Sequence, residues 1–224
     1  MPTGPLIGAQ IIVDAVGSLS PARILDLGLG TGKWGFLLRE QLEFALNRVD
    51  RADWCVTIDG VEGYARYIGD HQRVIYDDIY IEDVLTFLRT YPGPRYDVVL
   101  ALDLIEHFEP DDGVEMVSRA LDVARYAVIA TPKGYYSQEG HENVLELHKS
   151  WWPIKALRKI ARLTDASMRV VQPPMMTIAV LSRDGAIPPI RSYAAMTLLA
   201  AVKQLLVPER LYYRALGKTG PTIL

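Results

Sequence analysis

Three glycines at alternate positions follow an acidic residue near the start of the chain, in the sequence Asp-Leu-Gly-Leu-Gly-Thr-Gly at 26–32. Glycine has no β-carbon, so its backbone can turn tightly and lie directly against a ligand. A nucleotide-binding P-loop is excluded, because Leu27 occupies the place of its first glycine and Trp34 the place of its hydroxyl. The dinucleotide fingerprint fits poorly, because Lys33 occupies the place of its third glycine. Residues 26–32 are therefore expected to form a ligand-binding loop of another kind.

A second group of reactive side chains consists of Asp103, Glu106 and His107. If the chain turns helically there, these positions share one face, and two carboxylates and an imidazole converge. Such a set can remove a proton from a hydroxyl group, orient an acceptor, or bind a hard cation such as Mg²⁺ or Mn²⁺. His141 and His148 follow in a long loop and could add a ligand. We expect His148 to act together with the first three residues in catalysis.

The elements that position these groups follow from the alternation of short β-rich apolar runs with helical segments. This alternation predicts a parallel sheet with helices on both faces. The expected strands are 23–27, 55–61, 73–76, 97–102, 127–131, 168–171 and 176–181. The expected helices are 33–46, 64–69, 81–90, 111–124 and 152–163. The last two strands are too close in sequence to be parallel, so a mostly parallel seven-stranded sheet with an antiparallel C-terminal hairpin is predicted.

These motifs, in this order, resemble the class I S-adenosylmethionine (SAM)-dependent methyltransferases, over residues 20–182. The glycine segment resembles the family's first motif, and the segment from Tyr96 to Phe108 resembles its fourth-strand motif beside the transferable methyl group. The resemblance implies a three-layer, Rossmann-like α/β fold with SAM as the cofactor. It implies that the cofactor is bound by Asp26, Gly28, Gly30, Gly32, Glu62, Asp78, Ile79 and Ala101.

Two of these carboxylates have distinct roles in the family. Glu62, at the end of the second strand, matches the acidic residue that holds the ribose hydroxyls. Asp78 matches the carboxylate that accepts a hydrogen bond from adenine, with Asp77 as the alternative, and the backbone of Ile79 would meet the ring.

The residues after the fourth strand bear on the methyl acceptor. The [DN]-P-P-[YF] loop typical of base-amine methylation is missing, and Cys55 lies away from this face, which disfavours cytosine-carbon methylation. Asp103-x-x-Glu106-His107 is similar to the E-x-x-E-H segment of ubiquinone-biosynthesis and small-RNA O-methyltransferases, where a divalent metal orients the acceptor oxygen. Asp103 has a shorter side chain than the family's glutamate, so a metal site at these three residues is secondary to our main prediction.

That prediction is methyl transfer to an oxygen of a small molecule. Two alternatives stay open: a SAM-binding regulatory or partner protein without turnover, and a nicotinamide-dependent oxidoreductase.

The composition bounds these interpretations. The chain has 224 residues, 50% apolar and 23% charged, which excludes a disordered protein and permits a sizeable core. The single cysteine, Cys55, cannot form an internal disulfide, so a reducing cytoplasm is expected. Residues 1–20 do not have the pattern of a signal peptide, and no apolar run reaches the ~18 residues of a spanning helix. We expect a soluble protein.

Charge is divided unevenly along the chain. Residues 1–148 contain 12 Lys and Arg against 24 Asp and Glu, whereas residues 149–224 contain 12 against 3. The acidic part contains the predicted cofactor site, where carboxylates suit a cationic ligand. The basic part suits a dimer contact, an anionic acceptor or a membrane surface, and nucleic acid is disfavoured because no recognition motif is present.

The end of the chain is expected to form a helix at 192–207, apolar almost all round and ended by Pro208. Such a helix is buried against the domain or a second subunit, or it lies on a membrane surface. The predicted organisation is a methyltransferase domain at 1–184 and a helical extension at 185–224. Residues 186–224 are where a homodimer or peripheral membrane contact is expected.

Overall fold

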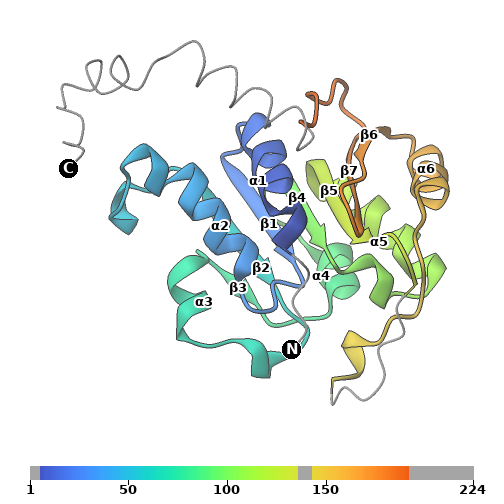
Figure 1. The fold of residues 1–224 in the computed structure, drawn as a ribbon. Helices are drawn as coiled ribbons and strands as arrows, with labels where there is room; N and C mark the ends of the chain where they lie inside the picture. Colours follow the sequence, from blue (N-terminus) through green and yellow to red (C-terminus); the bar gives the residue numbers. More distant parts are fainter. Residues whose placement is uncertain (1–5, 136–142, 192–224) are drawn as a thin grey trace, which may run out of the picture. The chain divides into compact units, whose positions relative to one another are not determined.

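A seven-stranded sheet forms the centre of the computed structural model, which describes residues 6–135 and 143–191 (Figure 1). The strand order is β3-β2-β1-β4-β5-β7-β6. The strands are β1 (Arg23–Leu27), β2 (Thr57–Val61), β3 (Ile79–Tyr80), β4 (Tyr96–Leu102), β5 (Ala124–Pro132), β6 (Ser167–Val171) and β7 (Met176–Ser182). The first five are parallel, and β7 runs antiparallel to both β5 and β6. The predicted mixed sheet is confirmed.

Helices cover both faces of the sheet. They are α1 (Ala9–Ser18), α2 (Lys33–Leu42), α3 (Asp70–Ile75), α4 (Val84–Thr90), α5 (Pro110–Val123) and α6 (Ile154–Leu163). Short 3₁₀ turns span Leu6–Gly8, Phe44–Leu46, Arg51–Asp53, Ala65–Tyr67, Ile105–His107 and Val144–Glu146. α4, α5 and α6 contribute to a core with β1, β4, β5 and β7, and α1, α2 and α3 cover the other face (Figure 1).

α5 illustrates why these segments are helical. Its first turn contains Pro110, whose missing N–H would have no intrahelical partner there, and two aspartates that suit the helix dipole. Its apolar stripe, which includes Met116 and Leu121, is buried against the sheet. The strands β4 and β5 are buried almost throughout, as expected for strands covered on both faces.

The region between β2 and β4 differs from the prediction. Residues 73–76 are not a strand: α3 runs to Ile75, and the third strand is the two-residue segment Ile79–Tyr80. The cause is Gln72, whose buried side chain accepts a hydrogen bond from the Gly69 backbone and donates to the carbonyls of Gly30 and Tyr67. These bonds stabilise a helical start for the segment.

Other bounds also shift. The helix expected at 64–69 is only a 3₁₀ turn, the one expected at 33–46 ends at Leu42, and α1 was not expected. The helix predicted at 192–207 lies outside the described residues. Among residues 6–135 and 143–191, no helix is long and apolar enough to cross a bilayer.

A buried arginine fastens α2 to the start of β2. Arg39 is 1% exposed, and its guanidinium donates to the carbonyls of Val56 and Ile75 and forms an ion pair with Asp77 at 2.6 Å. It also lies 4.1 Å from the ring centre of Trp54. Because each donor has a partner, the buried charge is compensated.

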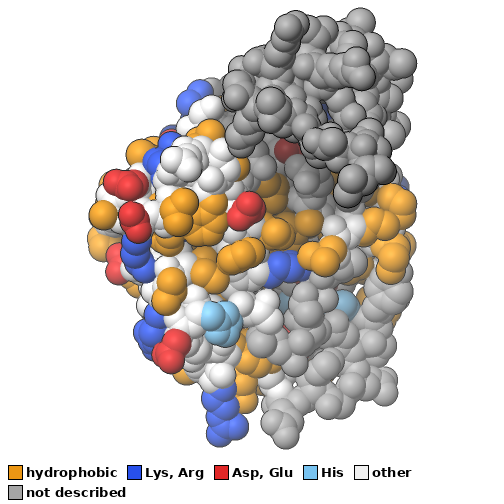
Figure 2. Space-filling view, turned by 60° about the vertical axis from the view of Figure 1, so that its left-hand side comes forward, with side chains coloured by type: hydrophobic (Ala, Val, Ile, Leu, Met, Phe, Trp, Pro, Cys, Tyr) orange, Lys and Arg blue, Asp and Glu red, His pale blue; other side chains and the backbone are white. Residues whose placement is uncertain are grey.

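Several arginines of the surface lie beside acids. Arg89 binds Glu115 and Arg95 binds Asp184, each at 2.7 Å, and Arg183 binds Asp122. Figure 2 shows this mixture on one face, where Lys and Arg side chains lie next to Asp and Glu side chains along the left-hand edge.

Candidate functional site

The glycine segment forms a tight loop between β1 and α2. Gly28, Gly30 and Gly32 have φ angles of +66°, +51° and +77°, which other residues adopt only under strain. A β-carbon at Gly28 would lie 2.8 Å from Leu104, whereas one at Gly30 would meet nothing closer than a backbone oxygen at 3.8 Å. The loop is therefore packed at Gly28 and open at Gly30, so a ligand can approach the backbone at Gly30.

Glu62 closes the loop from the end of β2. Its two carboxylate oxygens accept hydrogen bonds from the backbone N–H groups of Gly30 and Tyr64, both at 2.9 Å. Burial raises the pKa of Glu62, and these two hydrogen bonds oppose the rise. The carboxylate is thus held rigidly beside the open glycine.

Asp26 lies beneath the loop. It is 1% exposed, and the hydroxyl of Tyr76 donates to its carboxylate at 2.5 Å while accepting the N–H of Gly35 at 3.1 Å. Burial raises the pKa of Asp26 to about 7. The ring of Tyr76 fills the space where β-carbons at Gly35 and Gly60 would lie, at 2.4 and 3.1 Å. Asp26 therefore supports the loop from below.

A cavity of about 400 Å³ opens at the carboxyl ends of β1, β2 and β4. This is where ligands bind in open α/β sheets. The polar and glycine residues that line it include Gly28, Gly30, Lys33, Glu62, Asp83, Asp103, His107, Asn143 and Lys149.

Only some of the predicted cofactor residues line this cavity. Gly28, Gly30 and Glu62 do. The other five do not: Asp26, Gly32, Asp78, Ile79 and Ala101. Asp26 and Gly32 support the loop, and Ala101 is buried within β4.

Asp83 lines the cavity, whereas the predicted Asp78 does not. Asp78 is exposed and precedes β3, because the true strand begins at Ile79. Asp83 follows that strand, lines the cavity and caps α4 by accepting the N–H of Thr86 at 2.9 Å. An aspartate before an apolar helical run is a recognisable cap, and this signal could have found it.

Asp103 lies at the end of β4 in a strained conformation, with φ +52°. Within the described residues, one of its buried carboxylate oxygens has no hydrogen-bond partner. Burial raises the pKa of Asp103 to about 6, and the nearby Lys33 ammonium opposes the rise. Burial in turn lowers the pKa of Lys33, a cavity residue not predicted as functional. A carboxylate without a partner can accept a hydrogen bond from a ligand.

The turn Ile105–His107 presents Glu106 and His107. Glu106 is 3% exposed and accepts a hydrogen bond from the hydroxyl of Thr131 at 3.2 Å. Burial, together with repulsion from Asp103, raises the pKa of Glu106 to about 8. Nδ1 of His107 lies 3.3 Å from the Leu147 carbonyl oxygen, which can only accept, so Nδ1 carries the proton. Nε2 is then left with a lone pair.

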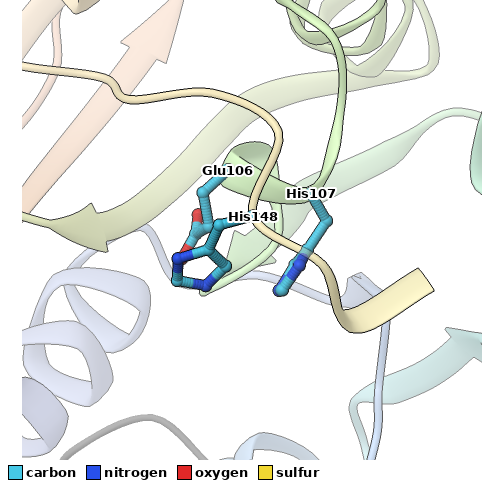
Figure 3. Close-up of side chains that lie close together, drawn as sticks. All are labelled: Glu106, His107 and His148. Atoms are coloured by element: carbon cyan, nitrogen blue, oxygen red, sulfur yellow. The ribbon is translucent and has the colours of Figure 1, made fainter. Parts of the chain in front are cut away.

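His148 completes this group. Its ring centre lies 4.9 Å from that of His107, and burial together with His148 lowers the pKa of His107 to about 4. Glu106, His107 and His148 each place one potential ligand atom within 4.8 Å of the others, and their side chains point to the same side (Figure 3). Asp103 is not part of this trio, so the predicted metal set of Asp103, Glu106 and His107 is corrected. His141 lies outside the described residues.

The segment that carries His148 is fixed above the cavity by the backbone. The N–H groups of Lys149 and Ser150 both donate to the carbonyl of Glu106, at 2.8 and 3.1 Å. Asn143, at the other end of the segment, donates to the Tyr67 hydroxyl at 3.2 Å. These bonds determine where the imidazole of His148 lies.

The sheet order, the antiparallel β7 and the glycine loop at the cavity define the fold of class I SAM-dependent methyltransferases. Many solved structures match this fold, and three of them illustrate it. An O-methyltransferase family protein from Burkholderia thailandensis is 14% identical with TM-score 0.55, and the match covers 80% of this chain and 57% of that one. Magnesium protoporphyrin IX methyltransferase from Synechocystis PCC 6803, with bound S-adenosylhomocysteine (SAH), is 17% identical with TM-score 0.56. The match covers 80% of this chain and 84% of that one. The methyltransferase domain of bacterial CtHen1 is 18% identical with TM-score 0.54, and the match covers 79% of this chain and 98% of that one.

Sequence comparison adds no nearer relative. No protein-family model matches the chain, and no curated protein matches it. At these identities the structural likeness shows the fold, and the chain spans little more than half of the Burkholderia protein.

Proposed function

We propose that this protein is a SAM-dependent methyltransferase. The observation that carries the proposal is the continuous cavity that runs from the open glycine loop and Glu62 to Asp103 and His107. Its carboxylates suit a cationic sulfonium. The Synechocystis structure of the same fold contains SAH, which supports the same ligand class here.

We infer how the chain would hold the cofactor. Glu62, fixed by two backbone N–H groups, would accept hydrogen bonds from the ribose hydroxyls. Asp83, in place of the expected Asp78, would meet the adenine end because it lines the cavity after β3. The backbone at Gly30 leaves room for close approach, since no side chain packs there.

The acceptor we propose is a hydroxyl oxygen of a small molecule. When bound, the cofactor would supply an electrophilic methyl group: the acceptor oxygen forms a bond to the methyl carbon as the sulfur–carbon bond breaks, and the sulfonium becomes a neutral thioether. His107 lines the cavity, and its Nε2 keeps a lone pair because Nδ1–H is committed to Leu147. It can take a hydrogen bond, and then the proton, from the acceptor hydroxyl. The unpartnered oxygen of Asp103 can hold a second donor of the acceptor.

The trio Glu106, His107 and His148 could also hold a divalent cation, which would orient the acceptor oxygen. Two imidazoles and one carboxylate suit Mn²⁺ better than the oxygen-preferring Mg²⁺. Calorimetric titration of each ion into the protein and into His148→Ala tests this. Heat from Mn²⁺ that disappears in His148→Ala would establish the site, and no heat in either protein would remove the metal from the mechanism.

Binding and turnover need separate tests. SAM and its demethylated product SAH should each raise the melting temperature, whereas NAD should not; stabilisation by NAD alone would overturn the proposal in favour of an oxidoreductase. A screen for transfer of a tritiated methyl group to phenols, sugars and fatty acids then identifies the acceptor. Binding of SAM without transfer to any class of acceptor would favour a regulatory protein.

A further inference from the structure

α6 carries an exposed row of four cations. Lys155, Arg158, Lys159 and Arg162 are all exposed, while Leu157 and Ile160 bury the opposite side of the helix against the sheet. The spacing of three, four and seven residues places the four charges on one face. In Figure 1, α6 lies at the outside of the sheet, beside β6. We call these four residues the α6 basic face.

The α6 basic face gathers four cations without ion pairs on one helix, whereas the other described arginines without an ion pair (Arg66, Arg73, Arg125, Arg169 and Arg191) are scattered along the chain. Eight other arginines of the described residues form ion pairs with acids. None of the four α6 cations has an ion pair within residues 6–135 and 143–191, and the nearest acid in sequence, Asp165, has none either. Like charges three and four residues apart destabilise a helix. A structural role does not account for such a row, whereas attraction of an anionic partner does.

Two exposed apolar side chains flank the α6 basic face in sequence. Trp151 is 52% exposed, and its indole N–H donates to the Lys133 carbonyl at 3.1 Å, which holds the ring in place. Leu163, the last residue of the helix, is 61% exposed. Tryptophan, leucine and basic side chains together are the composition that membrane interfaces favour.

We propose that the α6 basic face docks on an anionic lipid bilayer. The sequence beyond the described residues supports this partner, because 192–224 contains four more Lys and Arg, a single acid and the long apolar run SYAAMTLLAAVKQLLV. Nucleic acid would match the charges but leaves the apolar residues without a role. The docking is independent of methyl transfer, so either proposal can fail alone.

The test is flotation of the full-length protein with vesicles of phosphatidylcholine, with and without 30% phosphatidylserine. The variant replaces all four cations by glutamine: Lys155→Gln, Arg158→Gln, Lys159→Gln and Arg162→Gln. The control removes four exposed arginines elsewhere: Arg66→Gln, Arg73→Gln, Arg119→Gln and Arg125→Gln. Each variant lowers the net charge from −3 to −7, so the two variants are matched in total charge. The control also removes the exposed ion pairs of Arg119 with Glu115 and Asp122, and melting curves measure that effect.

Each cation near an anionic leaflet contributes a factor of about five to binding. We expect the α6 variant to lose at least about tenfold in partitioning to anionic vesicles, and the control to lose about twofold at most. High salt should abolish wild-type binding, and Arg158→Lys with Arg162→Lys should keep it, since charge is retained. Circular dichroism and melting curves verify that both variants are folded.

Three results would overturn the proposal: equal loss in variant and control, equal binding of the wild type to neutral and anionic vesicles, or α6-dependent binding to a 20-nucleotide RNA without vesicle binding. The last would assign the face to nucleic acid instead.

Discussion

Replacing Glu62 by glutamine tests the cofactor site most directly. The carboxylate offers one oxygen to each of two backbone N–H groups, on Gly30 and Tyr64. A glutamine has one carbonyl oxygen for the two donors, and its amide N–H groups would face one of them. It also removes the charge that we expect to accept the ribose hydroxyls.

The magnitude follows from these contacts. Loss of one hydrogen bond to a charged group costs about 1.5–3 kcal/mol, which raises the dissociation constant of SAM by roughly 10- to 150-fold. Isothermal titration with SAM and with SAH measures this, and the two ligands should weaken alike because they share the ribose.

Asp78→Asn is the matched control. It makes the same carboxylate-to-amide change on an exposed side chain that does not line the cavity, so the SAM dissociation constant should stay within about twofold. The reasoning is refuted if Glu62→Gln binds SAM as tightly as the wild type, or if Asp78→Asn weakens binding equally.

Three further predictions concern catalysis, pH and stability. His107→Gln should lower kcat of methyl transfer by about 10²- to 10⁴-fold and leave SAM affinity unchanged; a kcat near wild type would exclude a role in proton transfer. Burial raises the pKa of Asp26 from 3.8 to about 7, so the folded state keeps a proton that the unfolded state releases. Its stabilisation is complete below pH 3.8 and is lost as pH rises through about 7. Urea midpoints at pH 5 and 8 should show a smaller decline for Asp26→Asn, and an identical decline would contradict the assignment. Arg39→Met leaves the carbonyls of Val56 and Ile75 without their donor, while Glu43 keeps Arg48 and Asp77 keeps Arg51; it should lower the free energy of unfolding by about 2–3 kcal/mol. Urea denaturation measures it, and a loss below about 1 kcal/mol would show that water replaces the guanidinium.

The sheet was predictable because buried parallel strands read as continuous apolar runs. The runs that became β1, β4, β5 and β7 are buried almost throughout, and the predicted bounds were within a few residues. β3 was missed because it has only two residues, at the edge of the sheet, and hydrophobic patterning has little to act on. The apolar residues Val74 and Ile75, which suggested a strand, belong to α3, and the side chain of Gln72 stabilises that helix.

Where the predicted site residues lie depends on whether the strand that precedes them was predicted. Gly28, Gly30 and Glu62 follow strands that the sequence defines, and the structure places all three at the cavity. Asp78 was expected from a strand at 73–76 that the structure does not contain, and Asp83, which follows the observed β3, lines the cavity instead. His148 was expected to act with His107 because it follows in the long loop, but the ring contact itself depends on a loop 41 positions away that is held by bonds to the Glu106 carbonyl, and local sequence does not encode that geometry.

The position of Tyr76 has a consequence for how the sequence can change. Its ring occupies the β-carbon space of Gly35 and Gly60, on α2 and β2, while its hydroxyl holds Asp26 on β1. Alanine at 35 would collide with the ring at 2.4 Å, whereas alanine at 60 would collide first with Leu29. A smaller residue at 76 would leave a void and an unpaired carboxylate. Positions 26, 35 and 76 should therefore vary together among homologues: alanine at 35 should appear only where residue 76 has lost its ring and residue 26 its charge.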